Sequence, residues 1–226
     1  MDFQFMLEIL PTMLRAAVVT VEISALALVF GTALGILMGC ARVLGPRWLQ
    51  AIIQSMVDFI RGVPPLVPIA FIYFALPRFN VVLSEFWTGV VALSLIAAGY
   101  IVEIVRASIE SIDRGQNEAA LAIGMTSIMA LRFILLPQAA TRMIPPLTNE
   151  LANVVKASSL LSVVAVQEIT LVGNALIFEN FVFLEVIIEM VLLYLIITSV
   201  VQVIARAAEK HFANAYGAEH AASDIR

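Results

Sequence analysis

The residues best suited to chemistry lie in a long apolar stretch in the last third of the sequence. Asn153 and Lys156 fall on one face of a predicted helix, with Glu150 on an adjoining face. Charged groups are costly inside a bilayer, so they mark functional interior surfaces, and an ammonium there can bind a carboxylate. The alternative is that Lys156 neutralises Glu150 or extends to the membrane interface. The hydroxyls of Ser158 and Ser159 can bind a ligand or merely the preceding helical turn.

A second candidate site is a break in the apolar segment of about residues 52–76. Pro64, Pro65 and Pro68 remove backbone donors within five residues, which predicts a kink or an unwound turn. Such backbone is tolerated in lipid only against protein or a watery cavity. Broken helices often mark substrate sites in transporters, although many proline kinks serve only packing.

The polar interval at residues 111–127 separates the apolar segments and predicts a short surface helix. Gly115 and Asn117 are turn or cap formers that precede it. The residues that favour the helix or can end it are Glu118, Ala119, Ala120 and Gly124. A helix faced with alanine offers a low surface on which a partner can dock. An ordinary loop helix is the alternative.

The composition is that of an integral membrane protein. The chain has 226 residues, of which 62% are hydrophobic and 13% charged, with a mean hydropathy of +1.00. Soluble domains are roughly half apolar and about a quarter charged. A net charge of -4 with scattered basic residues argues against a nucleic-acid partner, and the single cysteine excludes an internal disulfide.

Helical spans are expected to account for nearly the whole chain. A bilayer core about 30 Å thick requires roughly 20 apolar residues in a helix. We therefore predict an all-α protein with about five transmembrane helices. Their approximate ranges are 13–41, 52–76, 86–109, 132–166 and 181–205. Gly31, Gly35 and Gly39 recur every four residues in the first, which predicts the close approach of another helix.

The distribution of basic residues predicts the orientation. With five spans, most of the arginines and lysines near span ends lie on one side of the membrane. These residues are Arg42, Arg47, Arg106, Arg114, Arg132, Arg206 and Lys210. By the positive-inside rule that side is cytoplasmic, so the N-terminus is predicted outside and the C-terminus in the cytoplasm.

The interval at residues 111–127 resembles the EAA loop of the membrane-spanning subunits of bacterial ATP-binding-cassette importers. The resemblance rests on Glu118-Ala119-Ala120, Gly124, Ile134 and Leu136-Pro137 at the spacing of that motif. Four further segments resemble permeases for polar amino acids, of the histidine and glutamine type: residues 59–67, 71–77, 100–106 and 156–160. The resemblance implies a type I importer transmembrane domain, residues 1–226 as a single permease domain, in the bacterial plasma (inner) membrane.

The resemblance also implies partners and roles. Residues 111–127 would form the cytoplasmic coupling helix, in which Glu118, Ala119, Ala120 and Gly124 contact an ATPase subunit. A second permease chain, identical or related, would complete the pathway, and an extracytoplasmic substrate-binding protein would deliver a small polar amino acid. The residues expected to bind the solute are Lys156, Asn153, Glu150, Ser158, Ser159, Leu66 and Val67. Ala157 stands where many relatives carry an acidic residue, which weakens the case for a cationic solute.

No catalytic or cofactor site is predicted on this chain. The Gly-x-x-x-x-Gly-Lys-Ser/Thr loop that cradles nucleotide phosphates is absent from the sequence, as is any cluster of Cys and His that suggests a metal. ATP and Mg are therefore expected in partner ATPase subunits. The alternative function is an ion-coupled secondary transporter of small polar solutes, with Glu22, Glu103 or Glu150 as the proton-coupling group.

Overall fold

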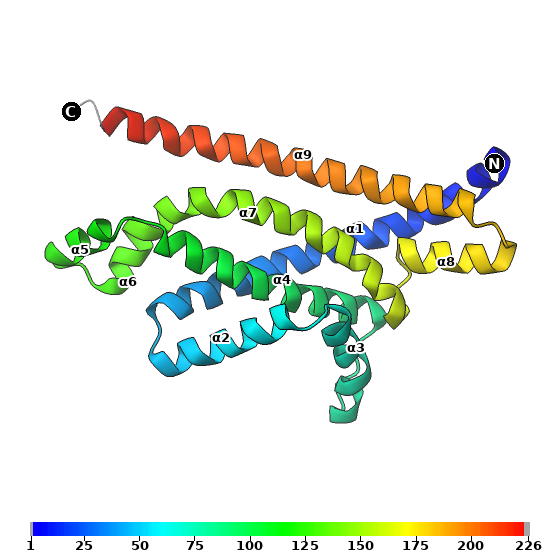
Figure 1. The fold of residues 1–226 in the computed structure, drawn as a ribbon, viewed down its shortest axis with the longest axis horizontal. Coiled ribbons are helices and arrows are strands. Elements are labelled where there is room, and N and C mark those ends of the chain that lie inside the picture. Colours follow the sequence, from blue (N-terminus) through cyan, green and yellow to red (C-terminus); the bar gives the residue numbers. More distant parts are fainter. Residues whose placement is uncertain (1, 224–226) are drawn as a thin grey trace.

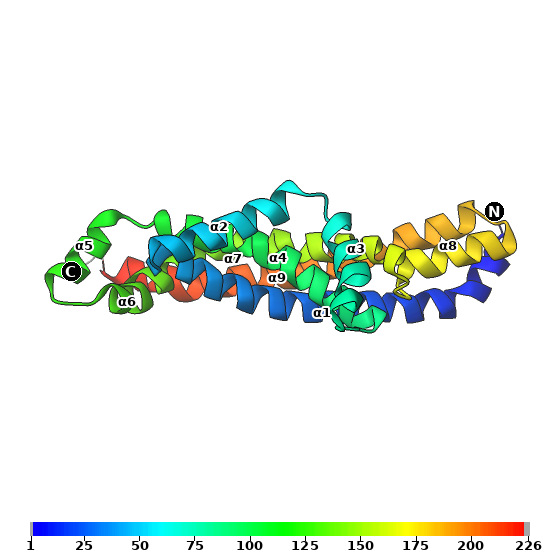
Figure 2. The ribbon, with the colours of Figure 1, turned by 90° about the horizontal axis from the view of Figure 1, so that it is seen from below.

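The computed structural model describes residues 2–223, with side chains described for residues 2–210, and this part of the chain contains helices and no strand. The elements in order are α1 (Phe3–Leu44), α2 (Arg47–Gly62), α3 (Leu66–Ala75), η1 (Leu76–Phe79), α4 (Glu85–Glu110), α5 (Arg114–Ala122), α6 (Ser127–Ala130), η2 (Leu131–Leu135), α7 (Leu136–Ala157), η3 (Ser158–Val164), α8 (Ile169–Asn180) and α9 (Leu184–Ser223). The long helices α1, α4, α7 and α9 form an elongated bundle (Figure 1). The helices α5 and α6 lie at one end with the C-terminal end of α9, and α8 lies at the other end with the N-terminus (Figure 2).

The number of helices that could cross a membrane agrees with the sequence prediction. In the described part of the chain three helices, α1, α4 and α9, are each long and apolar enough to cross a membrane. The number rises to as many as five if each of two bent pairs counts as one span, one formed by α2 with α3 and η1, the other by the stretch from α6 to η3 with α8. The ends of the helices differ from the prediction, because α1 begins already at Phe3 and α9 continues to Ser223.

The three regularly spaced glycines pack α1 directly against α4, as predicted. A Cβ atom added at Gly35 would lie 2.6 Å from the Cβ of Ile101, and one at Gly39 would lie 2.6 Å from the Cβ of Val105. The contacted residue number rises along both helices, so α1 and α4 run parallel. This contact belongs to the main hydrophobic core, which includes Ala27 and Ala97.

The predicted break in the second apolar segment is confirmed. Helix α2 ends at Gly62, α3 begins at Leu66, and the two axes differ by 108°. As a result α3 turns away from the direction of α2 and projects from the side of the bundle (Figure 1). Ile69 of α3 is fully buried in the main core, and α3 packs against η3. The break therefore places α3 against η3, the short helix that follows α7.

The two prolines in the middle of α7 do not end that helix. Pro145 and Pro146 lie inside it, and it continues to Ala157. The tighter helix η3 follows, and a bend of 51° leads into α8. Neither proline can donate the usual helical hydrogen bond, so this is a weak point of the backbone at which the helix can bend.

A cluster of charges joins three helices near the end that carries α5. The carboxylate of Glu103 in α4 forms ion pairs with Arg42 of α1 and with Arg106 one turn further along α4, the latter at 2.9 Å. Arg61 of α2 lies 4.0 Å from the same carboxylate. One partly buried carboxylate thus binds arginines from α1, α2 and α4.

Candidate functional site

The short helix α5 is built by local hydrogen bonds at both ends. Asp113 caps its start, and Oδ1 of Asp113 accepts the backbone N–H of Gly115 at 2.7 Å. The helix ends as predicted at Gly124, whose φ of +88° lies in the left-handed region. Backbone N–H groups of Gly124 and Met125 donate to earlier carbonyls in the pattern of a Schellman motif. The prediction that Gly115 and Asn117 precede the helix was wrong, because both lie inside it and the cap is Asp113.

The exposed face of α5 carries part of the predicted coupling residues. Glu118, Ala119 and Gly124 are exposed, whereas Ala120 is only 4% exposed and faces the protein. Several large apolar side chains are also exposed on α5, α6 and η2. They are Leu121, Ile123, Ile128, Met129 and Phe133. A carboxylate and a small residue beside exposed apolar side chains form a surface suited to another protein.

Two side chains of α7 bind the coupling segment, by which we mean residues 111–127. Nη1 of Arg142 donates to the backbone O of Ser111 at 2.5 Å and to its Oγ at 2.8 Å. One turn earlier, Nε2 of Gln138 lies 3.4 Å from Oε1 of Gln116 in α5. The start of the coupling segment is therefore bonded to α7, and one weak contact on the same face of α7 reaches α5.

The solute-site residues predicted on α7 are divided between two sides of that helix. Glu150 is buried, and its Oε2 accepts a hydrogen bond from Nδ2 of Asn153 at 3.3 Å. Lys156 is exposed and turned toward α9. In the described part of the chain no ion pair joins Lys156 to Glu150, so the alternative that these two residues neutralise each other is not supported.

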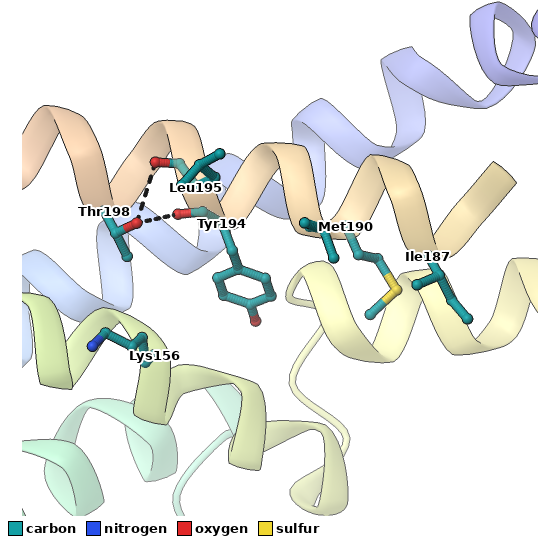
Figure 3. A pocket seen from close by; sticks show the side chains of 7 residues that line it. Lys156, Ile187, Met190, Tyr194, Leu195 and Thr198 are labelled. Atoms are coloured by element: carbon teal, nitrogen blue, oxygen red, sulfur yellow. Dashed lines mark hydrogen bonds between the residues drawn. The ribbon is translucent and has the colours of Figure 1, made fainter. Parts of the chain in front are cut away.

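Lys156 lines an open groove of about 410 Å³ between α7 and α9. Figure 3 shows Lys156 on one side and Met190, Tyr194 and Thr198 on the other. The hydroxyl of Thr198 donates to the backbone O of Tyr194 at 2.6 Å, which leaves the groove wall largely apolar. Among the described residues that line this groove, Lys156 is the one cation, and its ammonium can bind an anionic group.

Glu150 lines a different cavity, of about 460 Å³, between α2, α4 and α7. Its walls also carry Arg61, Glu103 and Arg142. The guanidinium of Arg61 lies over the ring of Tyr100, 5.6 Å from its centroid. Glu103 is engaged by Arg42 and Arg106, and Arg142 by Ser111, so Glu150 is the carboxylate of this wall that can receive an ammonium group.

The remaining predicted site residues have other contacts. Ser158 is fully buried and donates to the backbone O of Val155 at 2.8 Å, and Ser159 donates to the backbone O of Lys156 at 2.8 Å. These bonds match the alternative in which the hydroxyls bind the preceding turn. Leu66 and Val67 are partly exposed at the start of α3, on the element that packs against η3.

A buried polar cluster behind the groove was not predicted as part of a site. Glu168 is fully buried, and its Oε2 accepts a hydrogen bond from the hydroxyl of Tyr194 at 2.6 Å. Its Oε1 accepts the backbone N–H of Leu171 at 2.8 Å and so caps α8, while Oγ1 of Thr170 lies 2.9 Å from the Tyr194 hydroxyl. The sequence feature that could have identified Glu168 is a carboxylate directly before an apolar helix. Its partner, 26 residues away, could not be found from sequence spacing.

Both cavities lie within a region that matches a known family. A family model described as a binding-protein-dependent transport system inner membrane component matches residues 31–214, well over half of the chain. The chain belongs to this family. It is therefore a membrane-spanning permease component of such a transport system, and the matched range includes α5, α7 and most of α9.

Several relatives of this permease are similar over nearly their whole length. It is 36% identical over 211 residues to the glutamine transport system permease protein GlnP of Escherichia coli (strain K12), covering 92% of this chain and 96% of that protein. It is 35% identical over 212 residues to the probable amino-acid ABC transporter permease protein PatM of Vibrio harveyi, covering 91% and 95%.

Solved structures share the fold of this permease. The crystal structure of an amino acid ABC transporter with histidines matches with a TM-score of 0.85 at 29% identity, over 93% of this chain and 99% of the other. An inward-facing conformation of the MetNI methionine ABC transporter matches with a TM-score of 0.81 at 18% identity, over 94% and 99%. The second match supports the fold alone.

Proposed function

We propose that this permease is the translocation subunit of an ATP-driven importer of polar amino acids. The observation that carries the proposal is the near full-length similarity, at 35–36% identity, to permeases named for glutamine and amino-acid transport. The short helix α5 exposes Glu118 and Ala119 at one end of the bundle, which supports the same function. The whole chain then acts as one permease domain, with residues 111–127 as its coupling segment.

ATPase subunits dock on the exposed face of α5 in this proposal. Glu118, Ala119 and Gly124 contact the ATPase directly. Ala120 is buried and packs α5 against the rest of the permease. The neighbouring exposed apolar side chains extend the contact surface. ATP and Mg are bound by the ATPase subunits, and this permease receives their motion through α5.

The transport pathway is completed by a second permease chain, identical or related. About five helices are few for a pathway, and α7 exposes a polar stripe that includes Asn153 and Lys156. The end that carries α5 faces the cytoplasm, with the N-terminus at the opposite, outer end. Both views place the N-terminus and α5 at opposite ends of the bundle, which agrees with this orientation (Figures 1 and 2). A substrate-binding protein delivers the solute to the outer end.

The solute site lies around the second half of α7. Lys156 binds the α-carboxylate, while Glu150 and Asn153 receive the ammonium or a polar side chain. Since Lys156 and Glu150 open onto different cavities in the single chain, the site is complete only when a second chain covers the exposed face between them. Ser158, Ser159, Leu66 and Val67 frame this region through the contact between α3 and η3. Glutamine is the first solute to test.

The proposal is tested by copurification and uptake. The tagged chain, isolated from native membranes in mild detergent, should bring down an ATPase and a second permease copy or relative. The charge reversal Glu118→Lys should remove the ATPase and abolish uptake while the chain still inserts. Uptake that survives loss of the ATPase but stops with a proton uncoupler would instead establish the ion-coupled secondary transporter.

The role of Lys156 is tested separately with Lys156→Ala. Loss of a charge-assisted contact to the carboxylate should raise the half-saturating solute concentration by about tenfold. Arg15→Ala removes an exposed cation from α1, away from both cavities, and serves as the control, with no expected change. An unchanged value in Lys156→Ala would remove this residue from the site.

A further inference from the structure

We propose that Arg142 is the positioning residue that joins the coupling segment to α7, so that motion of α5 bends α7 at Pro145 and Pro146. The inference rests on the proposed function of α5 as the ATPase dock. It assigns a role in energy coupling to a residue that lies outside both α5 and the polar stripe of α7.

The contacts of Arg142 within the described structure span two elements that are distant in the sequence. Its Nη1 donates to the backbone O of Ser111 at 2.5 Å and to Oγ of Ser111 at 2.8 Å. Ser111 is the residue at which α4 ends and the coupling segment begins. Arg142 is exposed, and hydrogen bonds from a charged donor are stronger than neutral ones, so this contact links the start of the coupling segment to α7.

A second, weaker contact lies on the same face of α7. Gln138 is one helical turn before Arg142, and its Nε2 lies 3.4 Å from Oε1 of Gln116 in α5. The amide also donates to the backbone O of Ile134 at 2.9 Å, which orients it. The first half of α7 is therefore attached to the coupling segment at two points, of which Arg142 supplies the charged one.

The backbone just beyond Arg142 is built to bend. The residues at 145 and 146 are both prolines inside α7, so the carbonyls of Thr141 and Arg142 have no N–H donor four residues later. A bend at this point changes the angle between the half of α7 that is held to the coupling segment and the half that carries Glu150. Movement of α5 is thus converted into movement of the solute-binding half.

The cavity of about 460 Å³ extends across the hinge, by which we mean the point in α7 at which Pro145 and Pro146 allow the helix to bend. Arg142 lines it from before the prolines, Pro146 lies at the hinge, and Glu150 lines it from beyond. Bending α7 therefore changes the distance across the cavity between Arg142 and Glu150. The charged groups that face Arg142 from the other walls are Arg61 of α2 and Glu103 of α4, and Glu103 is already engaged by other arginines.

The test uses the complete importer, reconstituted with its ATPase, second permease and binding protein. The unaltered importer must first show ATP-driven uptake, and failure at this stage would count against the proposed function and not against the role of Arg142. In Arg142→Gln, maximal uptake should fall by about tenfold and the ATP hydrolysed per solute should rise. The half-saturating solute concentration should stay within about twofold, since Arg142 positions α7 and does not bind the solute.

Three further variants distinguish coupling from other roles. Arg142→Lys keeps a charged donor and should recover part of the coupling, whereas Arg206→Gln, an exposed arginine of α9, should leave it unchanged. Ser111→Ala removes the hydroxyl but keeps the backbone carbonyl that Arg142 also binds, so it should reduce coupling less than Arg142→Gln does and have no further effect in that variant. The proposal is overturned by a raised half-saturating concentration at normal ATP per solute, by loss of the copurifying ATPase in Arg142→Gln, or by normal uptake.

Discussion

Replacing Gly35 with valine tests how closely α1 and α4 pack. A Cβ atom at position 35 would lie 2.6 Å from both Cβ and Cγ2 of Ile101 and 3.2 Å from the backbone O of Ala98. Ordinary contact begins at 3.4 Å, and Ile101 is buried with only 1% exposure, so neither helix can yield locally. The helices must separate by several tenths of an ångström along the whole contact.

The cost can be estimated from general packing energies. Overpacking a well-filled core costs about 1–3 kcal/mol, and a gap of 0.5–1 Å forfeits roughly a quarter to a half of each dispersion contact. Replacing glycine inside a helix returns less than about 1 kcal/mol through improved helix propensity. We therefore expect Gly35→Val to lower the free energy of unfolding by about 2 kcal/mol. The loss from overpacking exceeds the gain in helix propensity, so Gly35→Val is expected to be less stable than the unaltered protein.

The assay is denaturation of the purified permease in mixed micelles, followed by circular dichroism. Gly62→Val is the matched control, because a Cβ at Gly62 meets nothing within 4 Å. The midpoint of Gly35→Val should shift clearly below that of the unaltered protein, and the midpoint of Gly62→Val should not. Equal midpoints for the two variants would refute the close packing of α1 on α4.

Two other predictions concern the end of α5 and the buried cluster at α8. Gly124→Ala should cost about 1–2 kcal/mol of helix stability, since φ is +88° and the surroundings are open, whereas Gly124→Asn should cost less. Hydrogen exchange of α5 amides measures both, and equal protection in the two variants would contradict the backbone argument. Tyr194→Phe leaves the buried Glu168 without its 2.6 Å hydrogen bond and should cost about 1–3 kcal/mol in the same denaturation assay. Tyr73→Phe is the control, and an equal loss in both would show that the bond to Glu168 contributes little.

Local patterns predicted the features that depend on residues close in the sequence. The glycine repeat in α1 and the prolines after α2 have direct geometric effects, and both appear in the structure. The end of α5 at Gly124 follows from the left-handed conformation that glycine adopts easily. The start of α5 was misplaced because the cap is Asp113, which lies shortly before Gly115 and Asn117, two residues that also favour turns or caps.

The candidate site depended on packing that the sequence pattern does not contain. Helical spacing correctly separates the faces of Glu150 and Lys156. It cannot show that α2 and α4 cover one face while α9 borders the other. The same limit applies to Glu168, whose burial depends on Tyr194 in a different helix.

The parallel contact between α1 and α4 has a consequence for biogenesis. Two helices that span a membrane in the same direction cannot be consecutive spans, so the segment formed by α2 and α3 must be made between α1 and α4. Synthesis proceeds at about 5–20 residues per second. The glycine face of α1 is therefore in the membrane without its partner helix for several seconds before α4 is synthesised. During this interval that flat surface is open to other nascent helices. A second permease chain that is synthesised nearby could pair with this surface before α4 does. Correct assembly of the transporter therefore depends on how soon α4 follows α1.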